Sequence, residues 1–223
     1  MKQGKILVEK EKKKMIRNFG KDLAAAHEAE RLVQMYFTLL GHQEYTFENV
    51  SADPEYYYKG DIQATNSSGN RIYIEVKDDS RIADTGNVLC EDQVYYMDGD
   101  YFGRGNMQGD TDVYCVVSQS EKKIYVMDFK VLKEIYKPYG IFKRIEHADQ
   151  TTHAYLLPLW VIKQRGAFIA EIDYSGESPV ANVYNQLEEE AKQIARRQES
   201  TRKWRENLEK NMALFDEWFA AIR

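Results

Sequence analysis

The chain has 223 residues, of which 43% are hydrophobic and 30% charged, and its formal net charge is −5. With only 13 Gly, 4 Pro and 2 Cys, it does not fit the collagen-like, low-complexity or disulfide-scaffold classes. No stretch approaches the roughly eighteen uncharged apolar residues of a membrane helix. The lysine-rich start lacks the apolar core of a secretory signal. We therefore expect a cytoplasmic protein with no membrane partner.

Charge is distributed unevenly along the chain. Lys and Arg are in excess in residues 1–22, the two signs balance in residues 188–223, and the acidic excess falls between them. An acidic middle suits a site that binds cations, although an acidic surface made only for solubility has the same composition. The basic start could follow DNA phosphates, and a solvated helix face explains it equally well.

The first predicted element is an amphipathic helix over 22–40, because apolar side chains recur there every three or four residues and Gly41 follows as a stop signal. Glu30 is a charged member of that apolar stripe. Glu28 is the alternative inward-facing acid if the helix is rotated.

The remaining pattern indicates a sheet followed by a helical tail. Residues 78–110 are polar and glycine-rich and predict a long loop, while residues 181–223 contain no Gly or Pro and predict a long helix. We expect a basic segment over 1–21, an α/β domain with a mixed sheet over 22–175, and a helical extension over 176–223. Strands are predicted at 43–50, 58–66, 70–77, 113–118, 123–129 and 167–174, a helix at 131–137, and a strand or core-lining element at 154–162.

The strands on either side of Ser67-Ser68-Gly69 predict a hairpin whose three-residue loop has Gly in the left-handed position. Counting away from that loop pairs Asp61 with Glu75, and directly paired residues have Cβ atoms about 4.5–5.5 Å apart. Lys77 lies two residues further along, on the same face. The register therefore predicts that Asp61, Glu75 and Lys77 form one cluster.

Two carboxylates this close repel each other unless they share a cation or a proton. Mg²⁺ takes oxygen ligands and commonly uses one or two carboxylates together with a substrate phosphate. A neighbouring lysine could orient or deprotonate a water, or neutralise charge that develops at phosphorus. These groups suit the hydrolysis of a phosphodiester, although Glu-x-Lys on a strand is also common as a solvated outer face.

Gly60-Asp61, thirteen further residues and then Glu75-Val76-Lys77, preceded by a helix that carries Glu30, resembles the PD-(D/E)XK nuclease superfamily. The resemblance implies a restriction-endonuclease-like αβββαβ core. It also implies that Asp61 and Glu75 bind Mg²⁺ (or Mn²⁺ as a substitute), that Lys77 assists the attacking water, and that Glu30 completes the metal site. Gly60 stands where the family pattern has Pro.

A further acid or Gln after the lysine occurs in some branches of that superfamily, and Glu91 or Gln93 could take this position. Thr85-Gly86-Asn87 followed by Glu91 is similar to phage and restriction-associated members. Arg104, in the glycine-rich stretch, could contact a phosphate. The alternative for all three of these side chains is an ordinary place in a loop.

The sequence thus predicts a Mg²⁺-dependent DNA endonuclease with Asp61, Glu75, Lys77 and Glu30 as its site. A homodimer through the C-terminal helix would suit cleavage of both strands, and a monomer with a docked tail fits equally. One alternative is a catalytically inactive nuclease-fold module that binds DNA or protein. Another is an RNA-cleaving enzyme, since no feature of the sequence reads a 2′-hydroxyl.

Overall fold

The computed structural model describes residues 19–40, 44–96, 102–147 and 150–183, together with residues 199, 202 and 203. The chain divides into two compact units, Met1–Tyr184 and Asn185–Arg223. Most of the basic segment predicted at 1–21 and most of the helical tail, with the dimer contact predicted for it, lie outside the described residues.

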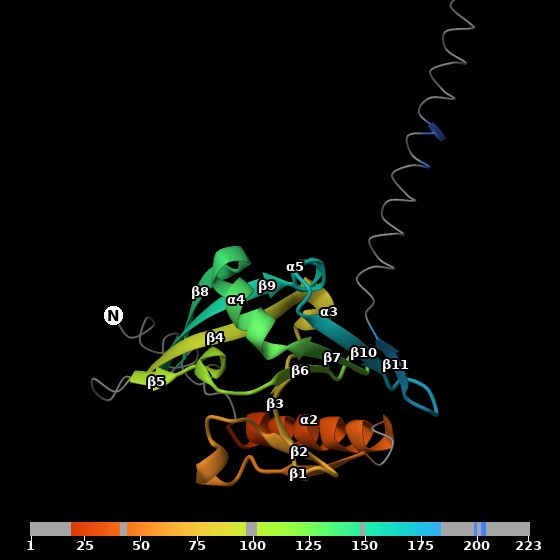
Figure 1. Ribbon diagram of the computed structural model, residues 1–223. Coiled ribbons are helices and arrows are strands. Elements are labelled where there is room, and N and C mark those ends of the chain that lie inside the picture. The colour runs from red at the N-terminus through yellow and green to blue at the C-terminus, as the bar shows by residue number, and fades with distance from the viewer. Residues whose placement is uncertain are drawn as a thin grey trace, which may run out of the picture. The chain divides into compact units, whose positions relative to one another are not determined.

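A seven-stranded mixed sheet forms the centre of the first unit (Figure 1). Its order is β1-β2-β3-β6-β7-β10-β11, in which β3 and β6 are parallel and every other neighbouring pair is antiparallel. This confirms the predicted α/β class with a mixed sheet. The strands are β1 (Tyr45–Asn49), β2 (Ile62–Asn66), β3 (Arg71–Asp78), β6 (Val113–Ser118), β7 (Lys123–Asp128), β10 (Phe168–Asp173) and β11 (Val180–Val183).

The helix α2 (Phe19–Leu40) packs along β1 to β3 (Figure 1). Ala29 and Val33 on α2 are fully buried against Ile62, Ile74 and Val76 of the sheet. Alternation along β3 therefore sends its aliphatic side chains toward the helix and leaves the intervening residues for the opposite side.

Two strands of a second sheet fall in the region predicted as a loop, so the prediction of a long loop over 78–110 was wrong. The order of this sheet is β5-β4-β9-β8. Val88 and Cys90 are fully buried in the core, and this alternation was hidden by the glycine-rich composition around it. The strands are β4 (Asn87–Tyr96), β5 (Phe102–Arg104), β8 (Ile141–Glu146) and β9 (Gln150–Pro158).

Short helices connect the two sheets and fill the core between them. They are α3 (Ile82–Thr85), α4 (Phe129–Tyr139) and α5 (Leu159–Gln164), with 3₁₀ turns η1 (Pro54–Tyr56) and η2 (Asn106–Gln108). Buried residues of α4 and α5, among them Leu132 and Ile162, pack with Val88 of the second sheet. The described helices include none with the length and apolar character needed to cross a membrane.

Several boundaries differ from the sequence prediction, among them the strand predicted over 58–66, which begins only at Ile62. Helix α4 continues through Pro138 and ends at Tyr139. Because the proline lies in the last turn, the helix loses only the one hydrogen bond that the missing N–H would donate. The apolar run 154–162 changes from strand to helix after Pro158. Residues 181–183, predicted as helix, belong to β11, which pairs with β10 at the edge of the sheet.

Gly60 ends the backbone pairing between β2 and β3. Its φ is +138°, and a Cβ atom placed there would lie 2.7 Å from the carbonyl oxygen of Ile74. Only glycine adopts this conformation without strain, so its presence allows the chain to turn away from β3 directly before Asp61.

We predict that Gly60→Ala lowers the free energy of unfolding by about 2 kcal/mol or more, because it adds a backbone clash to strain that alone costs about 1–3 kcal/mol. The control is Gly69→Ala at φ +82°, where an added Cβ meets no atom within 4 Å. That change should cost only about 1 kcal/mol. Urea denaturation measures both, and equal losses would contradict the close approach at Gly60.

Candidate functional site

The predicted hairpin register is confirmed. Ile62 pairs with Ile74 and Thr65 with Arg71, as expected from a loop at residues 67–69. Gly69 has a φ of +82°, in the left-handed region. The register shifts at the next step, because the Asp61 backbone N–H donates at 2.9 Å to the carbonyl oxygen of Ile74, which already pairs with Ile62. The direct pairing of Asp61 with Glu75 that the sequence predicted is therefore wrong, although both side chains lie near the same part of β3.

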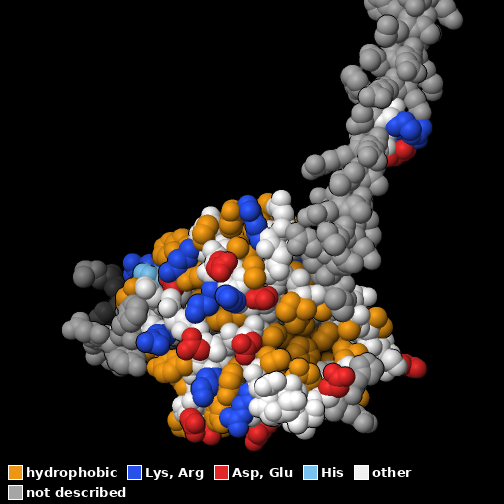
Figure 2. All heavy atoms as spheres, in the orientation of Figure 1, with side chains coloured by type: hydrophobic (Ala, Val, Ile, Leu, Met, Phe, Trp, Pro, Cys, Tyr) orange, Lys and Arg blue, Asp and Glu red, His pale blue; other side chains and the backbone are white. Residues whose placement is uncertain are grey.

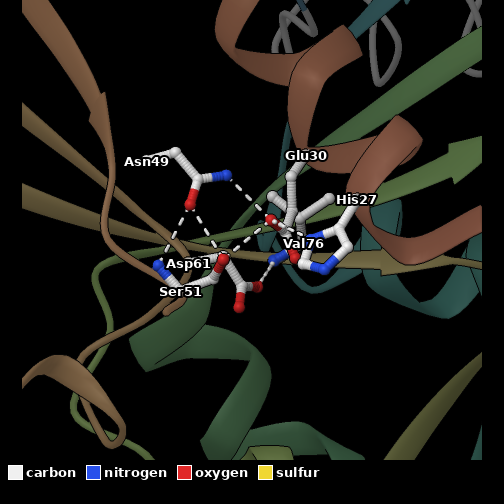
Figure 3. Close-up of polar contacts among 6 residues, drawn as sticks. All are labelled: His27, Glu30, Asn49, Ser51, Asp61 and Val76. Carbon is white, nitrogen blue, oxygen red and sulfur yellow. Dashed lines mark hydrogen bonds and ion pairs between the residues drawn. The ribbon is translucent and has the colours of Figure 1, made fainter. Parts of the chain in front are cut away.

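Beyond that point the Asp61 side chain, and not the backbone, supplies the hydrogen-bond acceptor for β3. Its Oδ2 accepts a hydrogen bond from the backbone N–H of Val76 at 2.7 Å (Figure 3). The departing strand no longer offers Val76 a carbonyl oxygen, so the carboxylate satisfies this donor. The Asp61 side chain is thereby fixed beside β3.

One cavity of about 310 Å³ is lined by Asp61, Glu75 and Lys77, and by Glu91 from β4. The structure thus brings together the three residues that the hairpin register predicts. The Lys77 Nζ lies 2.9 Å from Glu75 Oε1, in an ion pair whose side chains are 36% and 17% exposed. Three acids and one lysine therefore share a partly desolvated space.

The site raises the pKa of the Asp61 carboxyl to about 7. Burial is the largest cause, and the negative charge of Glu75 adds to it. Lys77 and the Val76 N–H oppose the shift but do not cancel it. Asp61 therefore changes its protonation near neutral pH.

Lys77 has the opposite balance. Burial lowers its pKa, but the carboxylates of Glu75, Glu91 and Asp61 raise it by more, so its pKa lies above that of a free lysine. The ammonium group is thus charged at neutral pH. In this state it can donate hydrogen bonds and stabilise negative charge but cannot accept a proton.

Glu30 is buried at 6% exposure, next to this cluster. Its Oε2 accepts hydrogen bonds from Asn49 Nδ2 at 2.8 Å and from Ser51 Oγ at 2.9 Å, and His27 Nδ1 lies 3.4 Å away (Figure 3). Its charge contributes to the raised pKa of Asp61. Ser51 lines the cavity, whereas Glu30 lies behind it.

The alternative acid on α2, Glu28, lies elsewhere. It is paired with Arg31 at 2.7 Å, and its side chain is 44% exposed. The apolar stripe of the helix therefore turns Glu30 rather than Glu28 toward the sheet.

A β-bulge in β4 lies between Glu91 and Gln93, the two candidates that follow Lys77 in the sequence. The pairing with β9 shifts between Glu91 and Gln93, so the extra residue Asp92 breaks the alternation. Glu91 and Val94 line the cavity, but Gln93 is not among the cavity-lining residues, and its Oε1 accepts a hydrogen bond from Tyr95 OH at 2.7 Å. The structure thus brings Glu91 to the site and not Gln93.

The Asp92 side chain does not line the cavity and instead contacts residues of α4 and η2. Its carboxylate accepts hydrogen bonds from Tyr136 OH at 2.8 Å and from Gln108 Nε2 at 2.6 Å, and lies 3.0 Å from Lys137 Nζ. These contacts fix the bulge, and with it the position of Glu91.

Asn106 is a positioning residue that the sequence did not single out. Its Oδ1 accepts a hydrogen bond from the Glu91 backbone N–H at 3.0 Å, and its Nδ2 donates to Tyr114 OH at 2.8 Å. A second cavity of about 460 Å³ shares Asn106, Lys77 and Glu91 with the first. No short-range pattern marks Asn106, because its partners come from β4 and β6.

The described residues contain no cluster of three or more His, Cys, Asp or Glu side chains arranged to hold a metal ion. The negative charge of Glu75 nevertheless raises the pKa of Asp61, and a cation bound by both carboxylates would relieve this repulsion. Mg²⁺ commonly uses only one or two protein carboxylates. The donor set therefore fits a hard divalent ion held by these two residues together with water or a phosphate.

Searches among protein-family models, curated proteins and solved structures found no match for this chain. The resemblance to the PD-(D/E)XK superfamily thus stays a prediction that rests on the motif residues and their arrangement.

We predict that Asp61→Asn stabilises the fold above pH 7 and has no effect below about pH 4. The folded carboxyl has its pKa raised to about 7, against about 3.9 when unfolded, so the wild-type protein loses stability as pH rises between these values. The amide oxygen can still accept the Val76 N–H. The difference at pH 8 should be on the order of 2–4 kcal/mol. Urea denaturation from pH 4 to 8 measures it, and a constant difference would contradict the raised pKa.

Proposed function

We propose that this protein is a Mg²⁺-dependent DNA endonuclease of the PD-(D/E)XK type. The observation that carries the proposal is the convergence of Asp61, Glu75 and Lys77 from one hairpin on one cavity. This constellation joins a cation-binding pair of carboxylates to a charged lysine.

The order of elements supports a restriction-endonuclease-like core in part. Helix α2, the antiparallel strands β1 to β3 and the parallel strand β6 follow the order of an αβββαβ core. Between β3 and β6, however, the chain forms the four-residue helix α3, two strands of the second sheet and η2, where the family core has a helix. The second sheet would then be an elaboration that closes the cavity.

In the proposed mechanism Asp61 and Glu75 would hold the metal ion. When bound, Mg²⁺ would neutralise charge on the scissile phosphate and favour ionisation of a coordinated water. The raised pKa of Asp61 means that cation binding competes with protonation, so occupancy should increase as pH rises toward and beyond 7.

Lys77 acts as a fixed positive charge in this scheme. Its ammonium group is held by Glu75 at 2.9 Å and stays protonated at neutral pH. It therefore orients a water or a phosphate oxygen by donating hydrogen bonds, and it does not take the proton from the water.

The remaining acids have different proposed roles. Glu91 faces Lys77 in the cavity and helps to keep its charge. Glu30 is a positioning residue, because it holds Asn49 and Ser51 behind Asp61. Its buried oxygen already accepts these hydrogen bonds, which suits an orienting role better than direct binding of a metal.

DNA affinity would come from groups at the cavity. Figure 2 shows a face on which Lys and Arg side chains are interspersed with Asp and Glu and do not form a continuous basic stripe. The net charge of −5 agrees with weak bulk attraction for DNA. Arg104, which also lines the cavity, is a second cation that would meet a phosphate of the bound strand.

We predict that Lys77→Ala reduces Mg²⁺-dependent cleavage of plasmid, linear duplex or single-stranded DNA by at least about 100-fold, because the charge stabilising the transition state is lost. The matched control is Lys123→Ala. Lys123 pairs with Glu171 at 2.9 Å, with side chains 29% and 22% exposed, outside the cavity.

Both variants lose an ion pair of the same length, and Lys77→Ala also leaves the acids of the cavity without their cation, so thermal unfolding of both variants is measured to confirm that each is folded at the assay temperature. Cleavage should be lost only in Lys77→Ala. Wild-type activity in that variant, or activity of the wild-type protein in EDTA, would remove the proposal. Parallel incubation with RNA tests the alternative of an RNA-cleaving enzyme.

The alternative of an inactive nuclease-fold module is favoured by one observation, the lack of a three-ligand cluster among the described residues. We predict that Mn²⁺ binds the wild-type protein and that Asp61→Asn weakens binding by about 10-fold or more, since a ligand is lost. The control Glu171→Gln, outside the cavity, should bind normally. Titration calorimetry at pH 8 measures the affinities, and no wild-type binding would favour the module.

A further inference from the structure

Two adjacent tyrosines present their side chains to solvent at the wall of the candidate cavity. Tyr57 is 73% exposed and Tyr58 is 49% exposed, and both line the same cavity as Asp61 and Lys77. Large aromatic side chains bury most of their area in a folded protein when nothing prevents it. Because this pair lies at the wall of a cavity, its exposed ring area is open to a flat, apolar ligand group.

The backbone holds these rings in a defined place. The Asp110 N–H donates to the Tyr58 carbonyl oxygen at 2.7 Å, and the Tyr57 N–H donates to the Pro54 carbonyl oxygen at 3.4 Å. The two rings are edge to face with centroids 4.9 Å apart. A ligand that stacks here would not need to order a flexible loop, so little conformational entropy is lost on binding.

A cation accompanies the rings. The guanidinium carbon of Arg104 lies 5.1 Å from the centre of the Tyr58 ring, and Arg104 also lines the cavity. Aromatic faces with an adjacent arginine are the combination that binds unpaired nucleotides, because the ring stacks on the base while the guanidinium meets the phosphate.

The size of the cavity limits what can enter. About 310 Å³ lies at the small end of ligand pockets, roughly 300–1,000 Å³, and suits one nucleotide rather than a stacked duplex. In a duplex both faces of each base are covered by neighbours. A base could therefore stack on one of these two perpendicular rings, with the other ring beside it, only if that base is unpaired or displaced.

We propose that Tyr57 and Tyr58 bind an unpaired DNA base next to the phosphate held at Asp61, Glu75 and Lys77. This rests on the proposed nuclease function for the identity of the ligand. It narrows the substrate to single-stranded DNA or to duplexes with unpaired nucleotides at the cleavage position.

The test measures binding by fluorescence anisotropy of labelled oligothymidylate and of a hairpin of equal length whose paired strands are joined by a non-nucleotide linker, so that it has no unpaired base, with the full-length protein in Ca²⁺. Oligothymidylate should bind at least about 10-fold more tightly than the hairpin. Tyr57→Ala and Tyr58→Ala should each weaken oligothymidylate binding by about 5- to 100-fold, the loss expected for one stacked base. Hairpin binding should not change, and Tyr58→Phe should retain the affinity, because the ring remains.

Tyr139→Ala is the matched control. Tyr139 is 43% exposed and lies 4.1 Å from the guanidinium carbon of Arg165, but it is not among the cavity-lining residues. It therefore removes a tyrosine that is exposed to nearly the same degree as Tyr58 and also has an arginine partner, and it should leave binding unchanged.

Stacking is overturned if the Tyr57 and Tyr58 variants bind like the Tyr139 control, or if all variants lose hairpin and oligothymidylate binding equally. Tighter binding of oligouridylate than of oligothymidylate would overturn the assignment to DNA. The nuclease proposal can fail independently of the stacking proposal, because binding in Ca²⁺ is measured without cleavage. Tyrosine-dependent binding with no Mg²⁺-dependent cleavage would keep the stacking site and remove only the enzyme.

Discussion

The hydrogen bond from the Val76 backbone N–H to the Asp61 carboxylate is the interaction on which the candidate site depends. At Gly60 the chain leaves β3, which deprives Val76 of a backbone acceptor while its side chain is buried. A buried donor without a partner costs about 1–3 kcal/mol. The hydrogen bond that β3 requires therefore keeps the Asp61 carboxylate in this position. The same bond fixes Asp61 within reach of the Glu75 charge, where function would require it.

The arrangement is electrostatically costly without a cation. Burial and the charge of Glu75 both disfavour ionised Asp61, and the single lysine does not compensate for them. Lys77 is meanwhile held positive by three acids. A site that destabilises its own fold near neutral pH is expected where binding of a ligand relieves the strain, since structural roles alone would favour a neutral side chain.

The second sheet gives the hairpin the opposite wall of a cavity. The bulge at Asp92 turns Glu91 toward Lys77, and the contacts of Asp92 with α4 and η2 keep it there. Tyr57 and Tyr58 also line this cavity, as does Arg104 from β5 of the second sheet. The cavity thus joins residues 57–77 with Glu91 and Arg104 of the second sheet, so both proposals depend on the packing of the two sheets.

The sequence by itself determined the hairpin and its acids. Asn66 and Gly69 set a local turn, alternation of period two fixed the faces, and the stripe of α2 turned Glu30 inward, because each of these depends on residues a few positions apart. Only the tertiary structure decided the second sheet, the choice of Glu91 over Gln93, and the places of Asn106 and the exposed tyrosines. The second sheet and the choice of Glu91 depend on pairing between β4 and β9 and on contacts with α4, whose partners are more than forty residues away in sequence. Asn106 bonds residues of two different strands, and the Tyr58 carbonyl oxygen bonds Asp110. No local pattern encodes such distant contacts.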